Sequence, residues 1–231
     1  MAWLGSVVFN LVMFGSGTVT GLIGQWLRRT APERLLGLGQ AWARLVLRAL
    51  RALCGVRFSL NGRENLPPGG VILAAQHQSA FDTLIWMALL ERPCYIFKHE
   101  LTRLPLFGPL IGPAGQIALD RDGGAGALRI LIKQVNEALA AGKQIIIFPE
   151  GTRVAPGVRG VLQPGIVALA RATGAVVVPV STDSGRYWAR NAFFKRAGTI
   201  DITLHPALPA GLHRQAMLDA LAEIFYDTNT R

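Results

Sequence analysis

The stretch VILAAQHQSAFDT, residues 71–83, carries a run of small and branched apolar residues that ends directly at a polar cluster. Its first five residues are apolar without alternation, which is typical of a strand buried on both faces of a parallel sheet. A helix is expected to begin near Asp82, so the chain turns from strand to helix within a few residues. An apolar strand, a polar turn and a helix in this order form the building unit of an α/β protein.

The same alternation of short apolar runs and helical stretches continues on both sides, from Gly55 to the end of the chain. It predicts strands at residues 58–60, 71–75, 95–98, 116–119, 145–148, 176–180 and 200–204. Helices are predicted at residues 126–141, 166–172 and 214–226, from apolar residues that recur at helical spacing. The fold class expected is therefore α/β, with a mostly parallel central sheet flanked by helices.

The N-terminal segment has a different character, because its first 27 residues contain no Asp, Glu, Lys or Arg. At about 1.5 Å per residue, a helix of this length would cross a hydrocarbon core of about 30 Å. Five glycines and two amides dilute its hydrophobicity, so it either inserts as an anchor, embeds shallowly, or is cleaved. Arg28, Arg29 and Arg34 follow the apolar run, which favours a retained anchor with the rest of the chain in the cytoplasm.

A second helix is predicted between Pro32 and Leu53, with apolar residues on one face and Arg44, Arg48 and Arg51 on another. An amphipathic, basic helix suits an anionic membrane surface, although a helix packed on the domain with a solvated basic face has the same pattern. We therefore expect membrane-anchoring helices at residues 1–54 and an α/β domain at residues 55–231.

The composition restricts the class of partner. Of the 231 residues, 51% are hydrophobic and only 16% are charged, which favours a membrane protein over an average soluble domain. The formal net charge of +10 favours an anionic partner, either phospholipid head groups, a phosphorylated substrate or nucleic acid. No nucleic-acid-binding module is recognisable and the basic residues do not form one tract, so no nucleic acid is expected.

Cysteine and histidine spacing argues against a metal or a disulfide scaffold. Cys54 and Cys94 are the two cysteines and form no CxxC pair, and the four histidines show no metal-ligand spacing. We expect neither a metal site nor another cofactor.

Two titratable side chains, His77 and Asp82, lie in the turn of the opening stretch. Residues five apart do not stack on one helix face, but a strand-to-helix turn brings them together. Asp82 would then accept a hydrogen bond from one imidazole nitrogen and leave the other to take a proton from a substrate hydroxyl. A single pair of this kind is more often a buried histidine beside a helix cap, so the spacing alone does not decide.

A second polar turn, Pro149-Glu150-Gly151-Thr152-Arg153, follows the apolar residues 145–148. Gly151 permits a tight turn with exposed backbone N–H groups, and Arg153 offers a planar, charged fork that suits phosphate. Glu150 would orient Arg153 or bind a polar group, but an ordinary surface turn with an ion pair between Glu150 and Arg153 also fits.

Arg121 follows another predicted strand and would reach the same sheet edge as Arg153. For Arg121 and for Lys98, a solvated surface position fits the sequence equally well.

Taken together and in order, four stretches closely resemble the motifs of the 1-acylglycerol-3-phosphate acyltransferase family. They are His77-Gln-Ser-Ala-Phe-Asp82, Ile117-Ala-Leu-Asp120-Arg121, Phe148-Pro-Glu-Gly-Thr-Arg153 and Val178-Pro179-Val180. The resemblance covers about residues 57 to 210, and the stretch from Lys98 to Gly108 is also similar to the family. It implies a glycerolipid acyltransferase-like fold with an N-terminal, membrane-associated helical pair.

The resemblance implies transfer of an acyl chain from acyl-CoA or acyl carrier protein to the free sn-2 hydroxyl of 1-acylglycerol 3-phosphate. The product would be phosphatidic acid, made for phospholipid biosynthesis at the cytoplasmic side of the inner membrane. In that reaction His77 is the general base, Asp82 orients it, and the acceptor's phosphate is bound by Arg121, Glu150, Gly151, Thr152 and Arg153. Direct attack by the hydroxyl requires no acyl-enzyme, so Ser79 is assigned a structural role.

One stretch departs from the family pattern. Where many members carry a lysine shortly before a glycine, this chain reads Val161-Leu162-Gln163-Pro164-Gly165. Either Arg159 or Arg171 takes the place of the lysine, or the phosphate site relies on two arginines.

The acceptor therefore stays open between 1-acylglycerol 3-phosphate, glycerol 3-phosphate and a lyso-aminolipid. Outside the enzymes, the alternative is a membrane phospholipid-binding protein without catalysis. The basic and aromatic residues at 186–196 form either a membrane-docking loop or a solvated loop.

Overall fold

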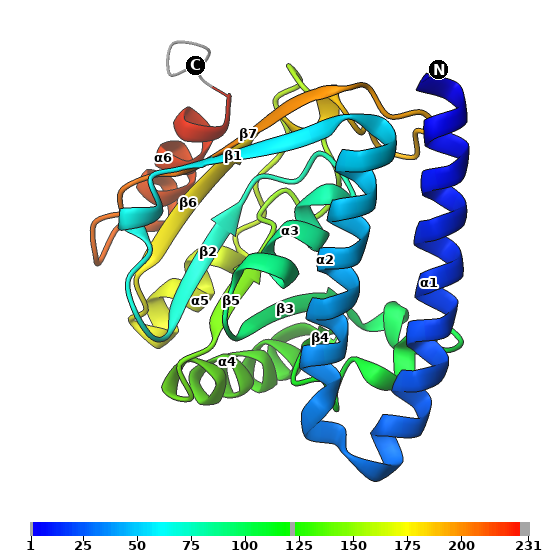
Figure 1. Ribbon diagram of the computed structural model, residues 1–231. Coiled ribbons are helices and arrows are strands. Elements are labelled where there is room, and N and C mark those ends of the chain that lie inside the picture. The colour runs from blue at the N-terminus through cyan, green and yellow to red at the C-terminus, as the bar shows by residue number, and fades with distance from the viewer. Residues whose placement is uncertain (1, 121–122, 227–231) are drawn as a thin grey trace.

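The computed structural model describes residues 2–120 and 123–226, and within them the chain forms a seven-stranded sheet in the order β1-β7-β6-β2-β5-β3-β4 (Figure 1). Neighbouring strands run parallel, except that β6 and β7 are antiparallel. The strands are β1 (Val56–Asn61), β2 (Val71–Ala75), β3 (Pro93–Lys98), β4 (Ile117–Leu119), β5 (Gln144–Ile147), β6 (Val177–Thr182) and β7 (Gly198–Leu204). The predicted fold class is confirmed, and each predicted strand is present: β2 has the predicted bounds, and the others are shifted by one or two residues at one or both ends.

Helices cover both faces of the sheet (Figure 1). On one face lie α1 (Ala2–Thr30), α2 (Leu35–Cys54) and α3 (Phe81–Leu89), and on the other α4 (Gly124–Ala140), α5 (Gly165–Thr173) and α6 (Arg214–Tyr226). Short 3-10 turns connect the elements: η1 (Pro32–Arg34), η2 (Arg63–Asn65), η3 (His99–Arg103), η4 (Gly108–Leu110) and η5 (Ser184–Arg186).

Strand β2 shows why the opening stretch of sequence has no polar alternation. All five of its residues are buried. Leu73 and its odd-numbered neighbours belong to the core shared with α2 and α3, whereas Ile72 and Ala74 belong to the core shared with α4, α5 and α6. Because successive side chains of a strand point to opposite faces, a strand covered on both sides has to be apolar at each position.

The helices α1 and α2 form a hairpin that packs along one side of the molecule (Figure 1). Val46 and Leu50 of α2 and Phe9 of α1 lie in the same core as β2 and α3. The apolar face of α2 therefore packs on the domain, while its arginines are exposed. The proposed boundary between residues 1–54 and 55–231 coincides with the end of α2, but both sides of it share one core.

Helix α1 also keeps a long apolar face uncovered. Its exposed large apolar residues are Trp3, Leu4, Leu11, Phe14, Val19, Leu22, Ile23 and Trp26. By length and composition, residues 3–30 are sufficient to cross a membrane. The opposite face of the same helix contacts the protein.

The sheet topology brings the polar turns together. Strands β2 and β5 are hydrogen-bonded neighbours and run parallel, as do β5 and β3, and β3 and β4. Because the carboxyl ends of parallel strands meet at one edge of a sheet, the segments that follow these strands converge there. His77 follows β2, Lys98 ends β3, Asp120 follows β4, and the turn from Phe148 to Arg153 follows β5.

Candidate active site

His77 and Asp82 meet as the sequence predicts. His77 Nδ1 lies 3.2 Å from Asp82 Oδ2, and Asp82 is buried in the first turn of α3. The same Oδ2 accepts hydrogen bonds from the backbone N–H groups of Gln78, at 2.7 Å, and Ser79, at 2.8 Å. A carboxylate at the start of a helix is also stabilised by the helix dipole. Because this fixed carboxylate faces Nδ1, it places the proton there and leaves Nε2 for a substrate.

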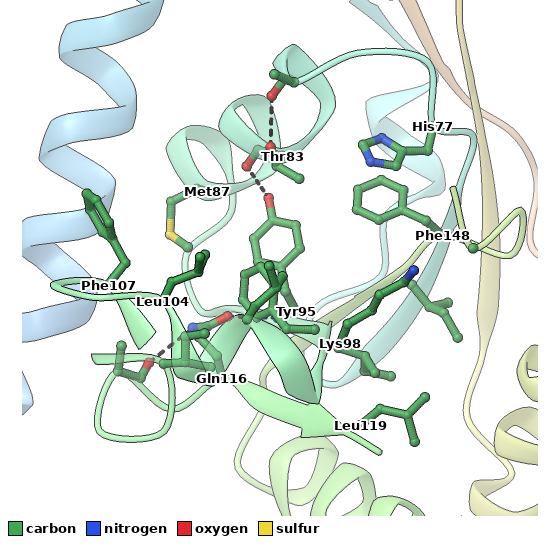
Figure 2. Close-up of a pocket in the computed structure, with 18 of the residues that line it drawn as sticks. His77, Thr83, Met87, Tyr95, Lys98, Leu104, Phe107, Gln116, Leu119 and Phe148 are labelled. Atoms are coloured by element: carbon green, nitrogen blue, oxygen red, sulfur yellow. Dashed lines mark hydrogen bonds between the residues drawn. The ribbon is translucent and has the colours of Figure 1, made fainter. Parts of the chain in front are cut away.

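The turn after β5 contacts the main chain and the ring face of His77. The backbone N–H of His77 donates to Glu150 Oε2 at 2.6 Å, and its carbonyl accepts from the N–H of Val154 at 2.8 Å. The imidazole stacks on the ring of Phe148, with 4.0 Å between the centroids (Figure 2). The main chain and the ring of His77 are therefore held by one loop, while its Nδ1 is held by α3.

Glu150 has partners that differ from the expected ones. Its Oε2 accepts from the backbone of His77, and its Oε1 accepts from the hydroxyl of Tyr226 at 2.6 Å. No ion pair joins Glu150 to Arg153 within the described residues. Burial raises the pKa of Glu150 to about 7, although the hydrogen bonds from Tyr226 and His77 lower it. The structure therefore has Glu150 support the histidine instead of orienting the arginine.

Gly151, Thr152 and Arg153 line a cavity beside His77. Gly151 has a backbone φ of +67°, which explains the glycine, and its N–H donates to the carbonyl of Phe148 at 3.0 Å. Burial lowers the pKa of Arg153, the charge of Asp82 opposes this shift, and the nearby Arg190 adds to it. Arg153 stays cationic at any physiological pH.

Other cations differ in their access to the site. Arg121 lies outside the described residues, and the residue before it, Asp120, lines the cavity. Lys98 lines the cavity as well (Figure 2), although the sequence left it as a possible surface charge.

The two arginines considered as substitutes for the family's lysine do not line the cavity. The Arg159 guanidinium lies over the Tyr226 ring, 5.9 Å from its centre, and Arg171 is exposed on α5. Arg190, from the loop after β6, does line the cavity, and its Nη1 donates to the carbonyl of Arg153 at 3.4 Å. Sequence reasoning missed Arg190 as a site residue, because it assigned the whole stretch 186–196 to a membrane-docking or solvated loop.

A largely apolar cavity of about 1170 Å³ is lined by His77, by Arg153 and by residues of α2, α3, β3 and the η3–η4 segment. Figure 2 shows His77 and Phe148 on one side of it and Leu104 and Phe107 on the other. Its apolar lining includes Trp42, Met87, Leu104, Phe107 and Leu110.

Tyr95 also lines the cavity and links its walls by hydrogen bonds. The Tyr95 hydroxyl donates to the carbonyl of Thr83 at 2.5 Å, and the Tyr95 N–H donates to Gln116 Oε1 at 2.8 Å. Lys98, Arg153 and Arg190 line the cavity together with His77 and form its cationic mouth. A cavity with such a mouth and an apolar interior suits a ligand with an anionic head and a hydrocarbon chain.

Metal-binding groups and reactive thiols are the other features to consider at the site. In the described ranges, no group of three or more His, Cys, Asp or Glu side chains could hold a metal ion. The two cysteines are buried and unpaired, and burial raises the pKa of both thiols.

Comparisons with known proteins agree with this geometry. Residues 57–183 match the family model described as Acyltransferase. The chain is 32% identical to the 1-acyl-sn-glycerol-3-phosphate acyltransferase of Pseudomonas aeruginosa, over 89% of this chain and 80% of that protein. It is 30% identical to the protein of the same name from Borreliella burgdorferi, over 68% of this chain and 63% of that one.

The fold has a solved counterpart. The crystal structure of the 1-acyl-sn-glycerophosphate acyltransferase PlsC from Thermotoga maritima superimposes with a TM-score of 0.75 at 20% identity, covering 97% of this chain and 95% of that one. The family match makes the chain an acyltransferase, and its histidine–aspartate pair lies beside an apolar cavity. The chain belongs to the acyltransferase family, within the group whose members are named 1-acyl-sn-glycerol-3-phosphate acyltransferases.

Proposed function

We propose that this acyltransferase moves an acyl chain from acyl-CoA or acyl carrier protein to the sn-2 hydroxyl of 1-acylglycerol 3-phosphate, forming phosphatidic acid for phospholipid biosynthesis. The observation that carries the proposal is the position of the His77–Asp82 pair where a cationic mouth opens into an apolar cavity. The names of the relatives support the same acceptor.

In the proposed reaction, His77 Nε2 takes the proton from the acceptor hydroxyl as its oxygen attacks the carbonyl carbon of the thioester. The tetrahedral intermediate collapses, the carbon–sulfur bond breaks, and the imidazolium returns its proton to the leaving thiolate. Asp82 stabilises the imidazolium, since its Oδ2 is already held in place by two backbone N–H groups. Both substrates bind before the chemistry, so no covalent enzyme intermediate is needed.

The acceptor's phosphate is proposed to bind at the cationic mouth. Arg153, Arg190 and Lys98 line it from three different segments, and guanidinium groups bind phosphate oxygens through paired, charge-assisted hydrogen bonds. Thr152 would offer its hydroxyl to the phosphate, and Gly151 allows the tight turn that carries Thr152 and Arg153. Arg121 stays a proposed ligand, whereas we now assign Glu150 to the support of His77.

The protein is proposed to work at the cytoplasmic side of the inner membrane. The uncovered apolar face of α1 supports membrane association, and the contacts of its opposite face with the domain support a helix that lies in one leaflet. An anionic lipid surface would match the formal net charge of +10.

Replacement of His77 tests the proposed chemistry. Purified protein in mixed micelles is offered 1-acylglycerol 3-phosphate, glycerol 3-phosphate and a lyso-aminolipid. Each acceptor is combined with a donor whose acyl chain is labelled, either acyl-CoA or acyl-loaded acyl carrier protein. The wild type should acylate the first acceptor, and His77→Ala should lower kcat by about a hundred- to ten-thousandfold, the usual contribution of a general base.

The matched control is His99→Ala, because His99 is exposed in η3 and does not line the cavity. It should keep wild-type activity. Turnover by His77→Ala within a few-fold of wild type would remove the assigned role, and a wild type that acylates another acceptor instead would replace the proposed substrate.

A further inference from the structure

The end of α6 lies against the loop that carries the catalytic histidine, although about 150 residues separate them in sequence. Gln76, directly before His77, donates from Nε2 to the carbonyl of Phe225 at 3.1 Å. The next residue of α6, Tyr226, donates its hydroxyl to Glu150 Oε1 at 2.6 Å. Because the other oxygen of Glu150 accepts from the N–H of His77, one unbroken chain of hydrogen bonds runs from Tyr226 to the main chain of His77.

The surroundings of the Tyr226 hydroxyl leave it little freedom. A Cβ atom at Gly160 would lie 2.8 Å from this hydroxyl oxygen and 3.5 Å from Glu150 Oε1, so a side chain at position 160 would displace the Tyr226 hydroxyl. Arg159 covers the ring of Tyr226. Burial and the neighbouring Glu150 raise the pKa of Tyr226, so the phenol keeps its proton and acts as a donor.

The charge state of Glu150 determines how strongly it holds His77. Glu150 is 4% exposed, and within the described residues it forms no ion pair with a lysine or arginine. The groups that act on it are the Tyr226 hydroxyl, the N–H of His77 and the carboxylate of Asp82. Hydrogen bonds to an ionised acceptor are about twice as strong as those to a neutral one. The ionised form of Glu150 therefore holds the His77 main chain more firmly than the neutral acid does.

The sign of the resulting pH dependence follows from the direction of the shift. Burial raises the pKa of Glu150 to about 7, and the hydrogen bond from Tyr226 lowers it. Above this pH the carboxylate dominates, and below it the neutral acid dominates. Loss of the Tyr226 donor would raise the pKa further and move this transition to higher pH.

We infer that Tyr226 is a positioning residue of this acyltransferase: it keeps Glu150 in the form and orientation that fix the main chain of His77. The last turn of α6 is thereby part of the catalytic apparatus without touching a substrate. The inference rests on the proposed function, because it takes His77 as the base of the transfer reaction.

The test is Tyr226→Phe in the full-length protein, which removes one oxygen atom and keeps the packing of the ring. At pH 7, kcat should fall about three- to tenfold, the effect of losing one hydrogen bond. The acidic limb of the kcat profile should move to higher pH, and kcat should recover toward the wild-type value near pH 9. The KM for 1-acylglycerol 3-phosphate should stay within about twofold, since no acceptor contact changes.

A second variant and a control complete the design. Glu150→Gln cannot ionise, so its profile should keep only the acidic limb that a general-base histidine gives, and adding Tyr226→Phe to it should shift that limb no further. Tyr187→Phe, the same loss of a hydroxyl in a half-buried tyrosine just after η5, should keep the wild-type profile.

Each outcome distinguishes the possibilities. A wild-type kcat profile for Tyr226→Phe, an equal fall at every pH, or a changed acceptor KM without a shifted profile would each overturn the positioning role. If Tyr226→Phe fails to fold, a Glu150→Gln profile whose acidic limb coincides with that of the wild type would overturn it too. A wild type that acylates none of the lysolipids would instead refute the proposed function itself.

Discussion

Asp82 collects three donors on a single oxygen: the imidazole of His77 and the backbone N–H groups of Gln78 and Ser79. The two backbone donors fix the Asp82 carboxylate in one orientation before any substrate binds. His77 therefore has a hydrogen-bond partner that is already in place. Preorganised charge of this kind costs no reorganisation during the reaction. At the scale of residues, the five-residue spacing between histidine and aspartate is explained by the tight turn that these bonds close.

The cationic mouth yields a prediction at the same scale. Arg190→Ala should raise the KM for 1-acylglycerol 3-phosphate about three- to tenfold with a small change in kcat, because it removes one exposed cation from the phosphate site. Arg153→Ala should have the larger effect, since Arg153 is more buried and the charge of Asp82 acts on it. Steady-state kinetics with the acceptor varied at saturating donor provides the measurement.

Arg171→Ala serves as the matched control, because Arg171 is exposed on α5 and does not line the cavity. It should leave both KM values unchanged. If Arg190→Ala altered only the kinetics of the thioester donor, its assignment to the acceptor's phosphate would be wrong.

At the scale of elements, α1 combines a packed face with an uncovered one. Its polar residues, which dilute the hydrophobicity of the sequence, serve the packed face: Asn10 Nδ2 donates to the carbonyl of Phe193 at 3.1 Å, and Gln25 Nε2 donates to the carbonyl of Leu106 at 2.7 Å. Buried Lys195 donates to Asn10 Oδ1 at 2.6 Å and lies over the rings of Phe9 and Trp188. These contacts hold α1 along the domain from its first turns to its last.

The uncovered face of α1 predicts how the protein binds lipid. Phe14→Glu and Leu22→Glu should each weaken binding to anionic vesicles by about tenfold or more, because each replaces an apolar side chain at the membrane surface by a charge. Both side chains are more than half exposed, so the fold should be retained. Vesicle co-sedimentation measures the partition coefficient, and circular dichroism confirms the fold.

Ile130→Glu is the control for this pair, since Ile130 is equally exposed but lies on α4, on the other face of the sheet. It should bind vesicles as the wild type does. Unchanged binding by both α1 variants would exclude this face as the membrane contact.

At the scale of the whole molecule, the cavity exists only because distant segments meet. Gly39 of α2 and Met87 of α3 both line it and are neighbours in its wall, since a Cβ atom at Gly39 would lie 3.8 Å from Met87 Sδ. The η3–η4 segment closes another side with Leu104 and Phe107. A hydrocarbon chain placed there would touch residues from three parts of the sequence.

Filling this space should change chain-length selectivity. Gly39→Leu should lower kcat/KM for a long-chain acyl thioester about tenfold relative to a short-chain one, because the added side chain occupies the apolar interior. Gly37→Leu on the same helix is the control, since a Cβ atom there would meet nothing within 4 Å and Gly37 does not line the cavity. Equal selectivity in the two variants would place the acyl chain elsewhere.

The strands and helices follow from local rules. Uninterrupted apolar runs such as Val71–Ala75 indicate doubly covered strands, and helical spacing predicted Arg214–Tyr226 with both of its ends correct. A parallel sheet then brings His77 and the turn at Gly151 to one edge. The meeting of His77 with Asp82 was also predictable, because a strand-to-helix turn lies between them.

Fold class and motifs were therefore predictable from the sequence, because periodicity, turn chemistry and motif order are local properties. The sequence did not reveal that Glu150 binds His77 and Tyr226 instead of Arg153. Nor did it reveal that Arg190 lines the cavity, whereas Arg159 and Arg171, two of the alternatives considered, do not. The physical reason is separation along the chain: residues 73 and 76 positions apart are paired by the packing of the whole molecule, which no short window of sequence contains.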